Sequence, residues 1–306
     1  MTIEHSNHLN FPIRFWQIII KSFRTYLSSF SSYLLLAILT YIPFLVFDQF
    51  SKFDLLDIIE FFHGNFLDII IFLTLPTLFT HKKVFPFATI ALFVQRFFTS
   101  AVIISFVQLG TLLFFMMFFA QISIGVIIIG IIPYVLLLFA GFFLIMENSS
   151  KLVSIKFNLI NSIKTVKTQF FSIFWNYINI TILMILPLFF FSAWYLGQHS
   201  GLAILTESIN KNGSIQSASG EKLLILIQDI VQESGFKWGR VSLHILFRPV
   251  KSLFLSFLFL GIIQQFSPNA VKAFLGDNKS EDSTDQSQPD NTDESIGDER
   301  KFNEHE

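Results

Sequence analysis

Residues Phe97 to Met146 read FFTSAVIISFVQLGTLLFFMMFFAQISIGVIIIGIIPYVLLLFAGFFLIM. This run of 50 residues contains no Asp, Glu, Lys, Arg or His. One helical crossing of a bilayer core needs about 20 apolar residues, so the run is long enough for two crossings. Lipid can solvate such a surface and water cannot, and the run therefore predicts an α-helical membrane protein.

The rest of the chain has the same bias. Of 306 residues, 52% are hydrophobic and 14% are charged, whereas soluble domains carry about 25% charged residues. We therefore predict an all-α, polytopic membrane bundle over residues 1–275, with about six spans and amphipathic helices at the interface. The spans are Ser31–Phe47, Asn65–Thr80, Ser100–Phe119, Ser123–Met146, Phe171–Tyr195 and Val250–Phe266.

The basic residues predict the orientation of the bundle. Short connections rich in Lys and Arg stay in the cytoplasm. Ten bases precede the first, third and fifth spans, and the first opposite loop has one, Lys52. We therefore expect both ends in the cytoplasm. The third outer loop, 197–248, carries five bases, but at about fifty residues it is long enough for the rule to weaken.

The C-terminal segment differs in composition from the bundle. Residues 276–306 carry eleven acidic and three basic side chains, a net charge of −8, and almost no large apolar groups. Such a segment cannot bury enough apolar surface to fold, so we predict a disordered acidic cytoplasmic tail. The chain has no cysteine, which excludes disulfides, thiol catalysis and cysteine-ligated metals. The first apolar run lacks a signal-peptide cleavage pattern, so we expect it to be kept.

Two cytoplasmic segments resemble each other. Residues 21–30 read KSFRTYLSSF and residues 161–170 read NSIKTVKTQF, so a serine, a base, a threonine and a phenylalanine coincide. Each segment leads straight into a span, and residues 82–100 occupy the equivalent place before the third span with a poor match. An internal repeat of an amphipathic helix followed by a two-span hairpin is one interpretation. The other is that basic amphipathic helices commonly precede spans.

The basic segments indicate the partner of the protein. Between residues 151 and 170, apolar side chains alternate with Lys156, Lys164 and Lys167. A helix with this pattern lies in the headgroup plane, with its bases near anionic lipid. We expect the bilayer and anionic lipid headgroups as partners and no nucleic acid, and protein partners stay open. Glu221–Glu233 also predicts an amphipathic helix, either on the membrane surface or against a partner.

A family resemblance rests on residues 130–176. Gly130-Ile131-Ile132-Pro133-Tyr134 leads through an apolar run to Ile145-Met146-Glu147-Asn148, then to a basic segment around Ser162 and Lys164, and to Phe170-Phe171-Ser172-Ile173-Phe174-Trp175. This order resembles the uncharacterised YciC-type bacterial inner-membrane proteins and is similar to the membrane domain of some glycerophosphodiester phosphodiesterases. The resemblance implies about six spans, the bacterial inner membrane and no assigned activity. Tyr134 stands where the family prefers glycine, and the last span lacks the usual basic ending.

No catalytic residue, metal site or cofactor is predicted. Asp54, Asp57 and Glu60 are spaced so that neighbours share a helix face, which could hold Mg²⁺ against a diphosphate. The second acidic cluster of such enzymes is absent, and an acidic, water-facing loop is the preferred interpretation. The seven histidines form no metal-binding motif.

Polar side chains inside the spans are the remaining candidates. Asn176 and Asn179 lie one turn apart, and Gln108 lies in the third span. They predict either a polar path or hydrogen bonds between helices. Arg248 and Lys251 lie at the outer mouth of the last span. Snorkelling to headgroups is the default expectation for them, and binding of an anionic lipid or partner is the alternative.

These features favour an integral inner-membrane protein without enzymatic activity, in a structural, lipid-associated or scaffolding role. The alternative is a transporter of a small solute or lipid. A lipid-modifying enzyme based on Asp54, Asp57 and Glu60 is the least favoured hypothesis.

Overall fold

The computed structural model describes residues 11–50, 56–119, 132–147, 152–198, 230 and 233–276. Within these ranges the chain is helical and has no strands, which confirms the all-α class. Its elements are α1 (Phe15–Ser28), α2 (Phe30–Phe50), α3 (Leu56–His81), α4 (Pro86–Leu92), the π-helical turn η2 (Phe93–Phe97), α5 (Phe98–Phe119), α7 (Ala140–Met146), α8 (Leu152–Thr168), α9 (Phe170–Gly197), α12 (Ser234–Phe266) and α13 (Pro268–Leu275).

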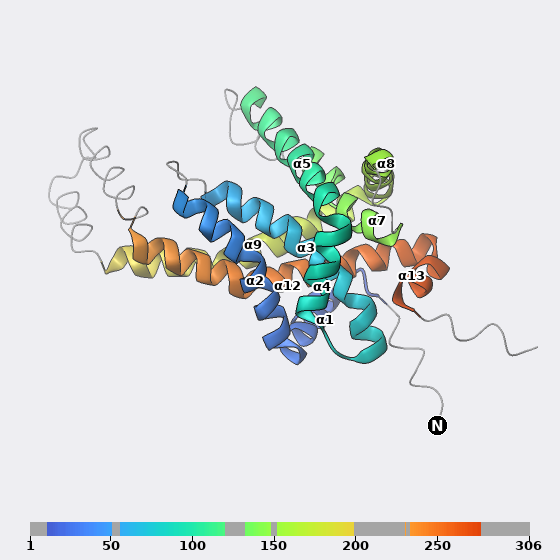
Figure 1. Ribbon diagram of the computed structural model, residues 1–306. Coiled ribbons are helices and arrows are strands. Elements are labelled where there is room, and N and C mark those ends of the chain that lie inside the picture. Colours follow the sequence, from blue (N-terminus) through green and yellow to red (C-terminus); the bar gives the residue numbers. More distant parts are fainter. Residues whose placement is uncertain are drawn as a thin grey trace, which may run out of the picture.

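Helices α3 and α12 form the centre of the bundle (Figure 1). α12 contacts α1, α2, α3, α9 and α13, and its residues from Ser252 to Ile263 are buried without interruption. Phe72 of α3 packs against Phe142 of α7 and Phe259 of α12 with ring centroids 4.7 and 5.5 Å apart. A helix that is apolar on all sides must be enclosed by other helices or lipid, and the surrounding helices enclose α12.

Contacts with α3 fix the directions of the first helices. α2 is antiparallel to α3, because Tyr33 meets Thr74 while Thr40 meets His63. α5 is also antiparallel to α3, since the rings of Phe66 and Phe98 and those of Phe62 and Phe106 are paired; the pair centroids lie 5.8 and 4.9 Å apart. The segment Ile132–Met146, which ends in α7, runs parallel to α3, as Tyr134 packs on Phe61 and Phe142 on Phe72.

The last two long helices continue the alternation. α9 is antiparallel to α12, because Tyr177 meets Lys251 and Phe191 meets Phe236. Six apolar segments therefore alternate in direction along the chain. By length, four helices in the described residues are able to cross a membrane, or five if the bent pair α1–α2 counts as one, and Ile132–Met146 is shorter. The start of the predicted fourth span and the acidic tail lie outside the described residues, so six crossings stay a prediction.

Two helices extend beyond the spans predicted from the sequence. α3 begins at Leu56 rather than Asn65, so Asp57 and Glu60 belong to a helix and not to a loop. α12 begins at Ser234 rather than Val250, which shortens the predicted outer loop 197–248. Pro249, which directly precedes the predicted sixth span, lies inside α12. Beside it, the Leu246 carbonyl accepts a hydrogen bond of 2.8 Å from the Tyr26 hydroxyl, and such outside partners let a proline stay in a buried helix.

The backbone supports the repeat for two of its three copies. Ser29, between α1 and α2, has φ −130° and ψ 34°, and Gln169, between α8 and α9, has φ −128° and ψ 30°. At each break the backbone amide donates to the carbonyl three residues earlier, and the N–O distance is 3.2 Å in both. The matched serines, Ser22 and Ser162, are both fully buried. Before the third span, α4, η2 and α5 continue without such a break.

Close packing of α7 on α3 gives a first testable prediction. A Cβ at Gly141 would lie 2.7 Å from Cγ1 of Ile69, whereas one at Gly110 would meet nothing within 4 Å. Overpacking a filled core costs about 1–3 kcal/mol, so Gly141→Ala should lower the unfolding free energy in detergent by that amount. Gly110→Ala is the matched control and should not lower it. Equal effects of the two substitutions would contradict the packing described.

Candidate functional site

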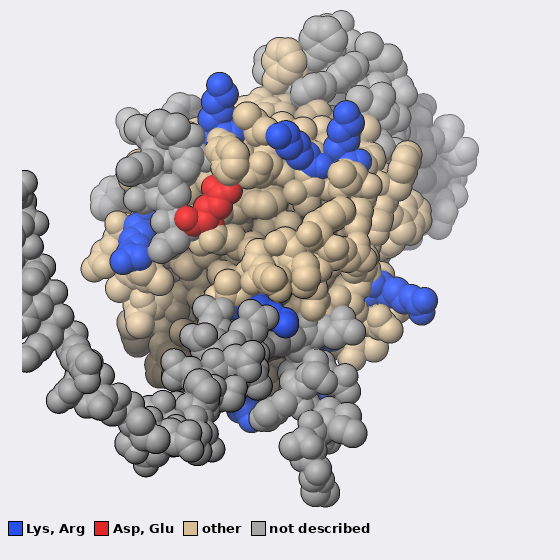
Figure 2. All heavy atoms as spheres, turned by 90° about the vertical axis from the view of Figure 1, so that its right-hand side faces the viewer, with Lys and Arg blue, Asp and Glu red and all other residues tan. Residues whose placement is uncertain are grey.

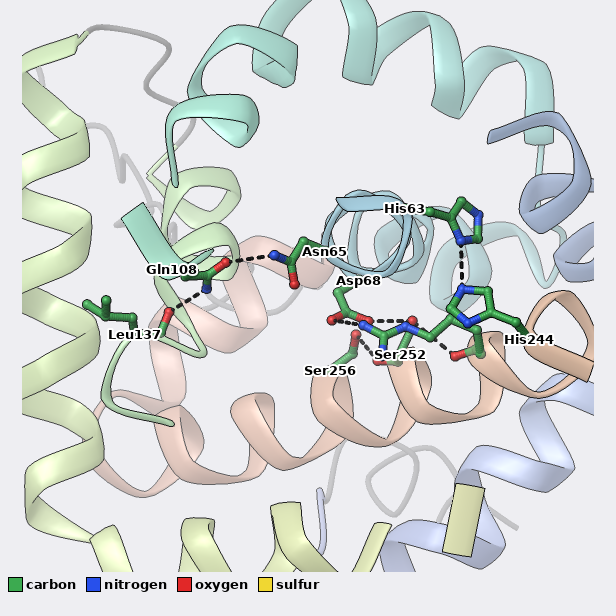
Figure 3. A network of polar contacts seen from close by, with 9 residues as sticks. His63, Asn65, Asp68, Gln108, Leu137, His244, Ser252 and Ser256 are labelled. Carbon is green, nitrogen blue, oxygen red and sulfur yellow. Dashed lines mark hydrogen bonds and ion pairs between the residues drawn. The ribbon is translucent and has the colours of Figure 1, made fainter. Parts of the chain in front are cut away.

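A buried ion pair joins the two central helices (Figure 3). Asp68 of α3, 7% exposed, accepts hydrogen bonds from Nη2 of Arg248 at 2.8 Å and from Oγ of Ser252 at 2.5 Å. Ser256 continues the polar row by donating to the Ser252 carbonyl at 2.8 Å. Charged groups within an apolar bundle are costly unless paired, and they commonly mark functional sites.

Glycine makes room for this pair. A Cβ at Gly64 would lie 2.7 Å from Cζ of Arg248, so a larger residue at position 64 would displace the guanidinium from this place against α3. The expectation that Arg248 snorkels to headgroups was wrong, because its side chain is 14% exposed and points into the bundle. The sequence contained the signal: Asp68 and Arg248 are an acid and a base in two different apolar helices, and each is the partner that the other needs.

Two histidines lie beside the pair. Nδ1 of His63 is 3.0 Å from Nε2 of His244, and Nε2 of His63 is 3.2 Å from the Ala37 carbonyl and 3.0 Å from Thr40 Oγ1. A carbonyl only accepts, so a neutral His63 carries its proton on Nε2 and its Nδ1 accepts from His244. Sequence reasoning treated the histidines as unrelated, since these two are far apart in the chain and only the parallel packing of α3 and α12 joins them.

A second ion-pair cluster lies near the start of α12. Arg240 forms salt bridges with Asp57 and with Glu60, the latter at 2.8 Å. The interpretation of these acids as part of a loop was wrong, because both lie in α3, where Arg240 binds them; the Asp57 side chain is 86% exposed and that of Glu60 is 15% exposed. Asp54 lies outside the described residues. Within the described part of the chain, no group of three or more His, Asp or Glu side chains is placed to hold a metal ion.

Gln108 belongs to a polar cluster on another side of α3 (Figure 3). It accepts from Asn65 at 3.0 Å and donates to the Leu137 carbonyl at 2.9 Å. The helix Ile132–Met146 is interrupted at Leu137–Phe139, and Ser162 binds there as well, through the Leu136 carbonyl and the Phe139 amide. The space beside Gln108 is about 10 Å³, which holds one water at most. Gln108 therefore stabilises a helix break in dry packing.

The asparagines of α9 do not join Gln108. Asn176, 7% exposed, donates to the Ser172 carbonyl of its own helix at 2.8 Å, and Asn179 is half-buried. The hydrogen bonds of the described residues link neither amide to Gln108. These three residues, proposed from sequence as one polar site, occupy separate places.

A cavity of about 190 Å³ lies between α9 and α12. Its charged and histidine lining consists of Glu60, Arg240, His244, Arg248 and Lys251, and the remaining lining residues are Thr181, Met184, Ile185, Leu188, Leu243 and Phe247. Lys251 places its amine 4.8 Å from the ring centroid of Tyr177. Among the described residues, no carboxylate forms an ion pair with Lys251.

The predicted lipid-contacting lysines lie on a different helix. Lys156, Lys164 and Lys167 of α8 are exposed. Phe157, Ile160 and Ile163 are also exposed, at 55, 38 and 39%. The opposite face of α8, with Ile155 and Val166, is buried against the bundle. α8 thus offers an outward surface of mixed cationic and apolar character.

No family model, curated protein or solved structure matches the chain. The class rests on the fold itself, whose long apolar helices fit an integral, multi-pass membrane protein.

The ion pair gives a second prediction. Removing one partner of a buried pair leaves an uncompensated charge and costs about 3–5 kcal/mol. Asp68→Asn and Arg248→Met should each lower the unfolding free energy in detergent by roughly that amount, and the double variant should lose clearly less than the sum. Lys272→Met, at an exposed lysine of α13, is the control. Additive losses would show that the two side chains do not interact.

Proposed function

We propose that the chain is an integral protein of the bacterial inner membrane with both ends in the cytoplasm. Its proposed role is lipid-associated, without enzymatic activity. The resemblance to YciC-type proteins supports this compartment, and the arrangement of the tryptophans carries the membrane assignment.

All four tryptophans are exposed, by 55 to 69%. Trp16 and Trp175 lie at one level of the bundle, since their neighbours Phe15 and Tyr177 contact α12 at Phe254 and Lys251. Trp194 and Trp238 lie at the other level: Trp238 is near the start of α12, and Tyr195, next to Trp194, donates to Glu233 at 3.0 Å.

The spacing of these levels fits a bilayer. Trp175 and Trp194 are about 28 Å apart along α9 at 1.5 Å per residue, close to the ~30 Å hydrocarbon core. Tryptophan concentrates at both membrane–water interfaces. Between the two levels α9 exposes large apolar groups, among them Ile182, Ile185, Phe189 and Phe190.

The proposed orientation is supported by the charge distribution. Figure 2 looks at the face on the right of Figure 1, where α8 and α13 lie, and basic side chains are spread over it while acidic ones are scarce. Lys82, Lys83 and Arg96 are exposed, like the three lysines of α8. Short basic connections stay inside, so this end is assigned to the cytoplasm.

A transporter of a small solute or lipid is the second candidate, because the cavity between α9 and α12 places cations inside the bundle. The dry surroundings of Gln108 speak against a path along that side of α3. A lipid-modifying enzyme has little support, since Asp57 and Glu60, the carboxylates that would bind Mg²⁺, both form salt bridges with Arg240.

The absence of cysteine permits a direct test of orientation. We expect single cysteines at exposed Lys82 and Lys164 to resist a membrane-impermeant maleimide added to spheroplasts, and one at exposed Ser234 to react. All three should react after the membrane is made permeable, which is the control. Labelling of Lys164→Cys and protection of Ser234→Cys in intact spheroplasts would contradict the proposed orientation.

The lipid-associated role is tested at α8. Each lysine near anionic lipid contributes about 1 kcal/mol, so the triple change of Lys156, Lys164 and Lys167 to Gln should reduce the phosphatidylglycerol retained on the purified protein in native mass spectrometry severalfold. Thr165→Gln with Thr168→Gln, on the same helix, is the control. Unchanged retention in the lysine variant would refute the proposed contact.

A further inference from the structure

Four nitrogen-bearing side chains of α12 share one face. Arg240, His244, Arg248 and Lys251 are spaced by four, four and three residues, which places them in one row on a helix, and all four line the cavity against α9. Three of them are cationic side chains, while the lining contains one carboxylate, Glu60, which Arg240 already binds. Asp68 pairs with Arg248 from outside the lining, so the end of the cavity at Arg248 and Lys251 has an excess of one positive charge, that of Lys251.

The cations at this end have hydrogen-bonding capacity left over. Arg248 gives Nη2 to Asp68, but its Nε is buried without a hydrogen-bond partner in the structure. Lys251 contacts the ring of Tyr177, and the described carboxylates form no ion pair with it. Buried cations need an anion or hydrogen-bond acceptors to offset their desolvation. Arginine and lysine together bind oxyanions such as phosphate and carboxylate through charge-assisted hydrogen bonds.

The walls of the cavity indicate an amphiphile. Met184, Ile185 and Leu188 of α9 face Phe247 and Leu243 of α12 across it, and Ile185 is 52% exposed on the surface assigned to lipid. A volume of about 190 Å³ exceeds by far the roughly 10–15 Å³ needed for one water. Lys251 lies beside Tyr177, two residues from Trp175, which is the level of the cytoplasmic headgroups in the proposed membrane placement and not the outer mouth expected from the sequence.

We propose that this cavity binds an amphiphile with a phosphate or carboxylate headgroup. The oxyanion sits on Lys251 and Arg248, and the apolar chain lies along Met184, Ile185 and Leu188. Asp68 and Gly64 act as positioning residues, because they hold the guanidinium of Arg248 in place. The inference rests on the lipid-associated role proposed above and names the ligand class for it.

The test uses the purified full-length chain in a neutral detergent and measures binding by thermal shift and native mass spectrometry. The probes are oleoyl lysophosphatidate, oleate, inorganic phosphate and the neutral monoolein. Lysophosphatidate and oleate should raise the melting temperature, and monoolein should not. Lys251→Met should weaken lysophosphatidate binding about ten- to a hundredfold, as expected for a lost charge-assisted hydrogen bond. Lys251→Arg should restore most of it, and Lys272→Met should leave it unchanged.

A second variant guards against a folding defect in Lys251→Met. Leu188→Trp fills the cavity from the lipid-facing helix α9 without removing a charge, and it should weaken lysophosphatidate binding as well. If inorganic phosphate raised the melting temperature as much as lysophosphatidate, the ligand would be a free oxyanion, and the proposal of an amphiphile would be wrong.

Two results would overturn the site itself. One is equal affinity for monoolein and lysophosphatidate, and the other is an affinity for lysophosphatidate that neither Lys251→Met nor Leu188→Trp changes. The proposed function fails separately, through the cysteine labelling and the α8 lipid retention, neither of which involves the cavity.

Discussion

The ion pair between Asp68 and Arg248 is the contact on which the arrangement of the bundle depends. It joins α3 to α12, the two helices that all other long helices surround. Neither charge can lie unpaired among the apolar side chains, because an unpaired ion in hydrocarbon is strongly disfavoured. The pair therefore fixes the register of the two helices: the guanidinium lies against Gly64, where a Cβ would come within 2.7 Å of it, and His63 meets His244 about one turn away.

A second constraint is the satisfaction of backbone groups where helices break. At the interruption Leu137–Phe139, Gln108 donates to the Leu137 carbonyl, and Ser162 donates to the Leu136 carbonyl and accepts from the Phe139 amide. Near Pro249, the Tyr26 hydroxyl donates to the Leu246 carbonyl. Membrane helices tolerate breaks only with such partners. The intramembrane polar residues thus divide into those that stabilise breaks and those, on α12, that face a cavity.

The sequence predicted the class of fold well and the site poorly. The charge-free run Phe97–Met146 is sufficient to predict an α-helical membrane protein. The match of 21–30 with 161–170 predicted a repeat, but it did not predict the helix breaks at Ser29 and Gln169, whose backbone angles are similar. The site depends on which helices lie side by side, and hydropathy carries no such information. Arg248 was assigned to headgroups because its partner Asp68 lies 180 residues earlier. Gln108 and Asn176 were grouped by polarity alone, yet the fold separates them.

In the proposed placement the bundle crosses a bilayer, and Asp68 and Arg248 lie between two levels of tryptophan. Depth-dependent quenching of tryptophan fluorescence by dibrominated phospholipids measures this directly in reconstituted vesicles, and all four tryptophans report. Bromines near the headgroups should quench more strongly than bromines near the bilayer centre. Strongest quenching by the central bromines, or no quenching by either lipid, would contradict the account.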